Sequence, residues 1–196
     1  LHNDGDGIDV AEHPEHKIWI PEMIFGHLRT STNYNKEEKR VVGGKNGFGF
    51  KLVLIYSKWG TIETIDHTRG LKYVQTFKDN LSVIDKPKIT KSKAKPYTKV
   101  SFLPDYERFG LKDGITDDMY ALLQKRVYDI SAVTGKGLKV KLNDAVVPIK
   151  TFEQYVNMYV GGKSETTRVY EQANDRWEYA VCVSPFGEFT QVSFVN

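Results

Sequence analysis

Apolar residues alternate with polar residues over several short runs in the first half of the chain. A period of two is typical of strands with one buried face, and it predicts strands over residues 60–65, 72–77, 81–84 and 98–102. Because these runs follow one another at regular spacing, we expect an antiparallel meander. Before them, residues 17–28 read as a short strand followed by a helix that begins at Pro21.

A second pattern, with apolar residues three and four positions apart, predicts helices. The longest helix has Thr116 as its N-cap and stops at Gly135, and its apolar positions are Met119, Leu122, Leu123, Val127, Ile130 and Val133. A continuous apolar run predicts a helix of about two turns over residues 50–57. Thr151 and Gln154 form a potential capping box for a helix that ends at Val160.

The second half of the chain adds more strands. Residues 138–142 and 146–149 bracket the turn pair Asn143-Asp144, which predicts a hairpin. Further strands are expected over 166–171, 177–183 and 189–195, after a polar break at 161–165 that marks a candidate domain boundary. We therefore expect domains at 1–160 and 161–196. The order of elements predicts an α+β fold with helices on one face of a mixed sheet.

Composition narrows the class of protein. The chain has 196 residues, 40% of them hydrophobic, which is enough for a packed core. Cys182 is the single cysteine, so neither a disulfide framework nor a cysteine-based zinc site is expected. The net charge of +3 is too small to indicate nucleic acid by itself. We expect no membrane association, since no apolar run is long enough to cross a bilayer. Without an initial Met, and with an apolar run at its end, the chain is expected to belong to something longer.

The segment 42–52, with sequence VGGKNGFGFKL, carries the clearest chemical signal. Four glycines lie within seven positions, directly before the apolar run. Glycine lets backbone N–H groups converge on one point, and the start of a helix adds unpaired N–H groups with a partial positive charge. Such a loop suits phosphates. It fits neither the Walker A pattern nor GxGxxG after a strand, so a different nucleotide pocket is expected.

Other polar residues can be interpreted either as functional groups or as residues that only stabilise local structure. Asn3 opens the turn sequence NDGDGI, and Ser31, Thr32 and Asn33 lie in a polar stretch, 29–43, that reads as a loop or lid. These groups could contact a nucleotide, or could simply satisfy turns and loops. Lys51 could hold a phosphate, or could extend from a helix surface into water.

Two further clusters are weaker signals. Six lysines occur within fourteen residues: Lys86, Lys88, Lys91, Lys93, Lys95 and Lys99. They could contact a phosphate backbone, but a solvated loop between two strands is the commoner outcome. His13 and His16 could bind a metal, although no complete set of ligands is evident. We assign no catalytic and no metal-binding residue within the chain.

Taken together, NDGDGI, TSTNY at 30–34 and the glycine loop resemble the GHKL ATPases, and within them the eukaryotic-type DNA topoisomerase II family. Segments IPEMIFGHL at 20–28, KYVQ at 72–75, RVYDI at 126–130 and ANDRW at 173–177 also resemble that family, so the resemblance covers essentially the whole chain. It implies the N-terminal ATPase domain, with the start of the transducer domain after about residue 160.

The resemblance also implies roles for individual residues. Asn3 would read the adenine amino group, and Ser31, Thr32 and Asn33 would contact ribose and phosphate. The triphosphate would be held by the loop residues Gly44, Lys45, Asn46, Gly47, Phe48, Gly49 and Phe50 together with Lys51. Lys45 stands where arginine is frequent in the family, and Phe50 stands where a small residue is usual.

The resemblance finally implies an activity for the parent enzyme. ATP and Mg²⁺ would be its cofactors. Nucleotide would close a gate between two protomers around captured double-stranded DNA, and one duplex would pass through a transient double-strand break. The family's glutamate that activates water and its asparagine that holds Mg²⁺ would lie before Leu1, and its switch lysine after Asn196. We therefore expect negligible ATP hydrolysis and weak ATP binding by these residues alone.

Residence in the nucleus is expected, or in a viral factory, the cytoplasm or a virion if the protein is viral. The alternatives are another GHKL ATPase, such as a chaperone or MutL-like protein, and a nucleotide-binding module without turnover.

Overall fold

The computed structural model describes residues 1–30, 44, 46–135 and 137–194. Contacts between Cα atoms divide these residues into two compact units, which meet in sequence between Gly114 and Ile115. The fold class is α+β, as expected. The expected domain boundary at 160/161 concerns the domains of the family and stays a prediction.

The first unit is built on an antiparallel sheet. Its strands lie in the order β1-β6-β2-β3-β4, and β5 also pairs with β3. The bounds are β1 (His2–Asn3), β2 (Ser57–Asp66), β3 (Leu71–Lys78), β4 (Val83–Ile84), β5 (Lys88–Lys91) and β6 (Tyr97–Pro104). Every pairing in this sheet is antiparallel among the described residues. Short connections join β2, β3 and β4 and permit only that direction, so this part of the predicted meander is confirmed. The last strand does not continue it, because β6 returns across the sheet to pair with β2.

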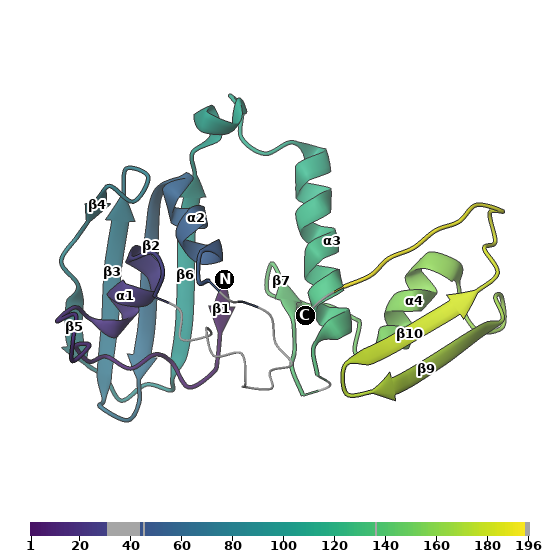
Figure 1. Cartoon of the computed structure of the whole chain (residues 1–196), viewed down its shortest axis with the longest axis horizontal. Coiled ribbons are helices and arrows are strands. Elements are labelled where there is room, and N and C mark those ends of the chain that lie inside the picture. The colour runs from purple at the N-terminus through teal and green to yellow at the C-terminus, as the bar shows by residue number, and fades with distance from the viewer. Residues whose placement is uncertain (31–43, 45, 136, 195–196) are drawn as a thin grey trace. The chain divides into compact units, whose positions relative to one another are not determined.

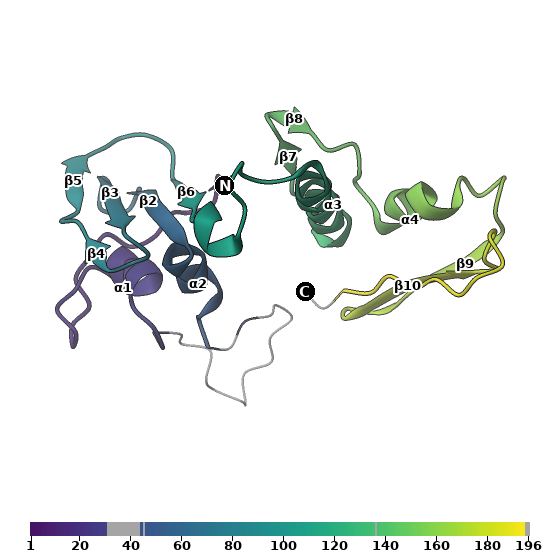
Figure 2. The same ribbon diagram turned by 90° about the horizontal axis from the view of Figure 1, so that it is seen from above.

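Two helices cover one face of this sheet (Figures 1 and 2). They are α1 (Ile20–Gly26), which has Pro21 in its first turn as expected, and α2 (Gly49–Ile55); a short 3-10 helix, η1 (Tyr106–Phe109), follows β6. Between helices and sheet lies a core of Phe25, Leu54, Ile62, Phe77 and Val100.

The contact between α2 and β2 requires a glycine. A Cβ atom added at Gly60 would lie 2.3 Å from Cδ2 of Leu54. Leu54 is 1% exposed, so it has little room to move. The absence of a side chain at Gly60 therefore lets α2 approach the sheet closely.

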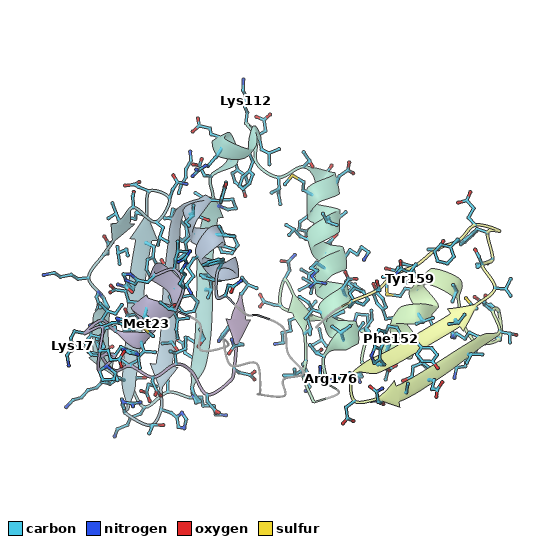
Figure 3. All side chains as sticks on the ribbon, viewed as in Figure 1. Lys17, Met23, Lys112, Phe152, Tyr159 and Arg176 are labelled. Atoms are coloured by element: carbon cyan, nitrogen blue, oxygen red, sulfur yellow. The ribbon has the colours of Figure 1, made fainter. Side chains whose placement is uncertain are left out.

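The second unit has its own core. It contains α3 (Asp117–Val133), α4 (Phe152–Val160), the two-residue strands β7 (Lys141–Leu142) and β8 (Ala145–Val146), and the hairpin of β9 (Arg168–Asn174) and β10 (Trp177–Cys182). Ala132, Val147, Ile149 and Tyr155 form this core. Figure 3 shows the side chains, among them those of Phe152 and Tyr159 on α4.

The capping signals in the second unit are confirmed. Oγ1 of Thr116 accepts the N–H of Met119 at 3.3 Å, and Oγ1 of Thr151 accepts the N–H of Gln154 at 3.2 Å. The Gln154 side chain returns to the N–H of Lys150, one residue earlier than in the usual capping box. Asn143 and Asp144 both adopt the left-handed conformation that the predicted hairpin turn needs.

Three predictions about strands are wrong. The short strand expected before Pro21 does not form, because among the described residues Trp19 makes only an isolated bridge with Glu12. Residues 88–91, expected as a loop, form β5, because Ile89 pairs with Tyr73 and is partly buried on the edge of the sheet. Residues 189–194, expected as a strand, have no strand assignment. Alternation of apolar residues does not supply a partner strand, and Phe194 instead packs its ring 5.9 Å from that of Tyr155.

None of the described helices is long and apolar enough to cross a membrane.

A buried polar network joins α3 to α4. The hydroxyl of Tyr155 donates to Oδ1 of Asp129 at 2.5 Å, and Nζ of Lys125 donates to both carboxylate oxygens at 3.0 and 3.1 Å. Tyr155 is 4% exposed and Asp129 5% exposed. Burial, and then the hydrogen bond to Asp129, raise the pKa of Tyr155 far above its ordinary value. The phenol therefore stays protonated as a donor.

We expect Tyr155→Phe to lower the free energy of unfolding by about 1–3 kcal/mol, because it removes a buried donor to the Asp129 carboxylate and leaves Lys125 as its partner. Urea unfolding followed by far-UV circular dichroism measures this change. Tyr179→Phe is the matched control, since its hydroxyl bonds Glu171 on an exposed strand, and its effect should stay within about 0.5 kcal/mol. Equal effects of the two substitutions would contradict the role given to the network.

Candidate functional site

The segment that follows Asn3 is fixed to β2 by side chains of that strand. Oγ1 of Thr64 accepts the N–H of Ile8 at 3.0 Å, and Oδ2 of Asp66 accepts the N–H of Val10 at 2.9 Å. Thr64 is fully buried and Asp66 is 3% exposed. Hydrogen bonds of this kind, far apart in sequence and shielded from water, hold the segment in one position.

Gly7 directly precedes the first anchored residue, Ile8, and cannot be replaced without strain. Its φ is +77°, and a Cβ atom there would lie 2.0 Å from the carbonyl oxygen of Ile65. The backbone of the turn thus runs directly against β2. Only glycine tolerates this close approach.

Asp66 is an electrostatic anchor as well. Burial tends to raise the pKa of Asp66, but N–H groups of Val10 and Arg69 and the guanidinium of Arg69 outweigh it, so the pKa lies below its ordinary value. Nη1 of Arg69 lies 2.8 Å from Asp66 and 3.1 Å from Asp9. One ionised carboxylate therefore holds two stretches of backbone together.

Asn3 lies at the opposite edge of the sheet from β5. It pairs with Thr98 across β1 and β6, and its side chain is exposed. Its Oδ1 accepts the N–H of Gly5 at 3.2 Å, which forms a local turn. On the neighbouring strand, Oγ1 of Thr98 lies 3.0 Å from Oγ1 of Thr64. An exposed side-chain amide is thus paired, through its backbone, with a residue whose hydroxyl is buried.

The described part of the glycine loop leads into α2. Gly44 and Gly47 have φ of +98° and +65°, and both are exposed, as are Asn46, Phe48 and Gly49. Phe48 is the N-cap residue of α2 and supplies no side-chain hydrogen bond to it. Phe50 departs from this exposed set, since its ring packs 4.8 Å from that of Phe25. The large residue at position 50 therefore has a place in the core.

Lys51 is the most unusual group of the site. Its side chain starts from α2 and is 4% exposed, and Nζ donates to Oγ1 of Thr30 at 3.1 Å. No carboxylate of a described residue forms an ion pair with it. Burial lowers the pKa of Lys51 from its ordinary value. The interpretation of Lys51 as a solvated surface lysine is therefore wrong.

Thr30 links this lysine to the end of α1. Its Oγ1 lies 3.0 Å from the carbonyl oxygen of Met23 and 3.2 Å from that of His27, either of which can accept its proton. The hydroxyl can then accept from Lys51. Thr30 thus orients the ammonium without neutralising it.

The two halves of the site share one scaffold. Asn3 reaches β6 through the pairing of β1, and α2 packs on β2 and β6 in the same unit. Ser31, Thr32, Asn33 and Lys45 lie outside the described residues, so their roles stay predictions.

Sequence reasoning missed Thr64, Asp66 and Thr98. Thr64 and Thr98 are buried polar residues of predicted strands, and Asp66 lies one residue beyond the predicted end of β2. The sequence offered one signal, since threonine and aspartate occur in runs that otherwise alternate with apolar residues. Their partners could not be known without the register of the sheet.

The histidine pair does gather with Glu15, and the three potential ligand atoms lie within 4.8 Å of one another. However, Nδ1 of His13 accepts the N–H groups of Glu15 and His16 at 3.3 and 3.4 Å. This nitrogen acts in a turn. Two imidazoles also do not suit Mg²⁺, which prefers oxygen ligands, so this cluster is a poor site for it.

Comparisons with known proteins agree with this arrangement. No protein-family model matches the chain. The chain is 47% identical over 196 residues to a protein of Dictyostelium discoideum described as probable DNA topoisomerase 2, and 46% identical over 197 residues to DNA topoisomerase 2 of Acanthamoeba polyphaga mimivirus. These matches include 99% of the chain but only 13% and 15% of the relatives.

Comparison with solved structures identifies the part of those relatives to which the chain is similar. The ATPase region of Saccharomyces cerevisiae topoisomerase II superposes with a TM-score of 0.87 at 45% identity, over 93% of this chain and 48% of that one. The ATPase and transducer domains of DNA topoisomerase II from Balamuthia mandrillaris give a TM-score of 0.91 at 44% identity, over 100% and 49%. The chain belongs to the type II DNA topoisomerase family. The likeness favours this family over a chaperone or a MutL-like ATPase.

In this topoisomerase-family chain, we expect the anchor at Asp66 to fail in acid. A carboxyl with a lowered folded-state pKa stabilises the fold above its unfolded pKa, near 3.8, and this contribution is lost as the pH falls through the folded value. Asp66→Asn should therefore destabilise the protein at pH 7, and the difference from the parent should shrink as the pH falls below 4. Urea unfolding across this pH range measures both.

Asp113→Asn is the control, because Asp113 is exposed. It should leave the pH profile unchanged. A parent and an Asp66→Asn variant that lose stability in parallel down to pH 3 would exclude Asp66 as the titrating anchor.

Proposed function

We propose that this chain binds ATP and forms the nucleotide-binding part of a type II DNA topoisomerase. Asn3 would accept the adenine amino group, and residues 44–51 would hold the triphosphate. In the whole enzyme, ATP would close a gate between two protomers on double-stranded DNA, and one duplex would pass through a transient break in another. The resemblance to the family and the solved ATPase regions support this proposal.

The observation that carries the proposal is the burial of Lys51. An ammonium removed from water is costly unless an anion compensates it. Among the described residues that anion is missing, and the side chain starts in the first turn of the helix behind the glycine loop. A triphosphate placed against this loop would supply the compensating charge. The donors therefore fit the phosphate groups of a nucleotide.

Different residues of the chain would bind the base and the phosphates of the nucleotide. Asn3 would read the base, because its Oδ1 can exchange the N–H of Gly5 for that of an adenine. The anchors at Thr64 and Asp66 would keep Asn3 in place. Lys51 would attract the phosphates as a point charge whose position is set by Thr30. Mg²⁺, when bound to a nucleotide, neutralises phosphate charge, but we assign no residue of this chain to it.

We also propose that the enzyme works where its DNA lies. This is the nucleus for a cellular protein, and a viral factory for a viral one. Support comes from the curated relatives, which include both kinds of source.

We expect Lys51→Met to weaken ATP binding by about 10- to 100-fold, since a hydrogen bond to a charged group is worth about 1.5–3 kcal/mol. The same change should raise stability without ligand, because it removes a buried charge. Calorimetric titration with ATP and with adenosine measures binding, and adenosine affinity should not change. Lys58→Met is the control, since Lys58 is half-exposed and paired with Glu107. Unchanged ATP affinity in Lys51→Met would sink the proposed phosphate role.

We expect Asn3→Ala to reduce the preference for ATP over GTP by about 2- to 10-fold, the equivalent of one hydrogen bond. Competition titrations with the two nucleotides measure this ratio. Asp4→Ala is the matched control, because Asp4 is an exposed residue of the same turn. Should both variants keep the parent ratio, Asn3 does not read the base.

A further inference from the structure

Residues 86–95 form the most strongly charged surface of the first unit. This run contains Lys86, Lys88, Lys91, Lys93 and Lys95, and it contains no acidic residue. All five side chains are exposed. Their combined charge of five exceeds the net charge of +3 of the whole chain, so the remainder is slightly acidic. Positive charge is therefore concentrated here, and we call this run the lysine edge.

The fold places the lysine edge at a border of the sheet. β5 has β3 as its partner, with Lys88 opposite Val74 and Lys91 opposite Leu71. It lies at the edge opposite β1, which carries Asn3 (Figures 1 and 2). The sheet thus separates β5 from Asn3, whereas the segment after β5 leads back to β6, the neighbour of β1.

Nearby carboxylates do not neutralise these charges. Asp85 directly precedes the run, but its Oδ2 is 2.6 Å from Nζ of Lys78. Glu63 on β2 is paired with Lys72 at 3.0 Å and accepts the hydroxyl of Tyr97. None of the five lysines makes an ion pair with a described residue. The lysine edge is therefore available to an external anion.

Protection of an exposed strand edge is the simpler use of lysine. That purpose accounts for Lys88 and Lys91, which lie within β5. It does not account for Lys86, Lys93 and Lys95, which lie in the flanking segments. The charges continue beyond the strand, as a binding surface for an extended anion requires.

We propose that the lysine edge binds the phosphate backbone of duplex DNA. Lys88 and Lys91 are three residues apart in β5, so their side chains leave opposite faces of the strand and flank its outer edge on both sides. The run 86–96 contains no aromatic residue on which unpaired bases could stack. The dense and regular charge of a duplex fits this surface better than single-stranded DNA does. The inference rests on the proposed function, and it adds a DNA contact within the nucleotide-binding part.

The test compares the parent chain with the triple variant Lys88→Gln/Lys91→Gln/Lys93→Gln. Binding to a labelled duplex of about 21 bp, or two helical turns, is followed by fluorescence anisotropy at several salt concentrations. Three lost phosphate contacts should lower the slope of log K against log salt by about 2.7 and weaken binding at low salt on the order of 100-fold. The variant with arginine at these three positions should keep the parent affinity.

Lys112→Gln/Lys139→Gln/Lys150→Gln is the matched control, because it removes the same charge from exposed positions elsewhere. Lys112 extends into solvent beyond η1 (Figure 3). An equal loss of affinity in this control would overturn the proposal. So would unchanged affinity in the first variant, binding of single-stranded DNA as tight as that of the duplex, or equally effective competition by polyglutamate.

A second measurement does not depend on the folding of any variant. Lysines of the parent chain are acetylated with and without duplex, and the sites are quantified by mass spectrometry. Protection of Lys88, Lys91 and Lys93 but not of Lys112 supports the proposal, and equal protection overturns it.

Measurements of nucleotide affinity distinguish a failure of DNA binding at the lysine edge from a failure of the proposed nucleotide binding. The triple variant should still bind ATP, whereas Lys51→Met should lose ATP affinity and keep DNA affinity.

Discussion

The close contact between Leu54 of α2 and Gly60 of β2 is the constraint on which the first unit depends. It brings the helix so near the sheet that every residue on the inner face of α2 is withdrawn from water. Lys51 precedes Leu54 by three positions and so shares its face of the helix. The packing that completes the core therefore also buries an ammonium group. Burial of Lys51 is a consequence of good apolar packing one turn further along.

A second consequence concerns the strand that receives the helix. β2 holds α2 through Gly60, and it holds the segment after Asn3 through Thr64 and Asp66. Asn3, proposed to read a base, and Lys51, proposed to hold phosphates, are thus both positioned by contacts with the same strand, β2. Their separation can change little while β2 stays paired on both sides. A ligand of fixed length benefits from this, because less ordering remains to be done on binding.

Much of this arrangement could be predicted from local patterns. The alternation in β2, β3 and β6 and the helical spacing in α3 come from how a half-buried element must distribute its apolar residues. The glycine loop could be predicted because the glycine residues themselves indicate a backbone conformation that other residues rarely adopt. By contrast, the buried state of Lys51 depends on a contact between α2 and β2, and the pairing of Asn3 with Thr98 depends on register across 95 residues of chain. Neither the burial of Lys51 nor this pairing can be predicted from a short stretch of sequence.

The errors have the same origin. The lysines and Pro87 around β5 predict a loop, because they outweigh a single apolar residue, Ile89. An edge strand, however, needs only one paired side. Residues 189–194 alternate as a strand should, but among the described residues they find no ladder to join. Local alternation states which face of a segment can be buried. It does not state whether a neighbour is present to bury it.

The first unit thus carries positive charge in two physically different settings. Lys51 is enclosed, so its attraction to an anion arises from relief of desolvation, and dissolved salt screens it weakly. The lysines of β5 and its flanks are surrounded by water, so their attraction to a polyanion arises from release of counterions and falls steeply with salt. A short anionic tail would favour the first setting, and a long regular backbone would favour the second. Because the two settings use different lysines, the nucleotide and the duplex proposed for them would not compete for the same groups.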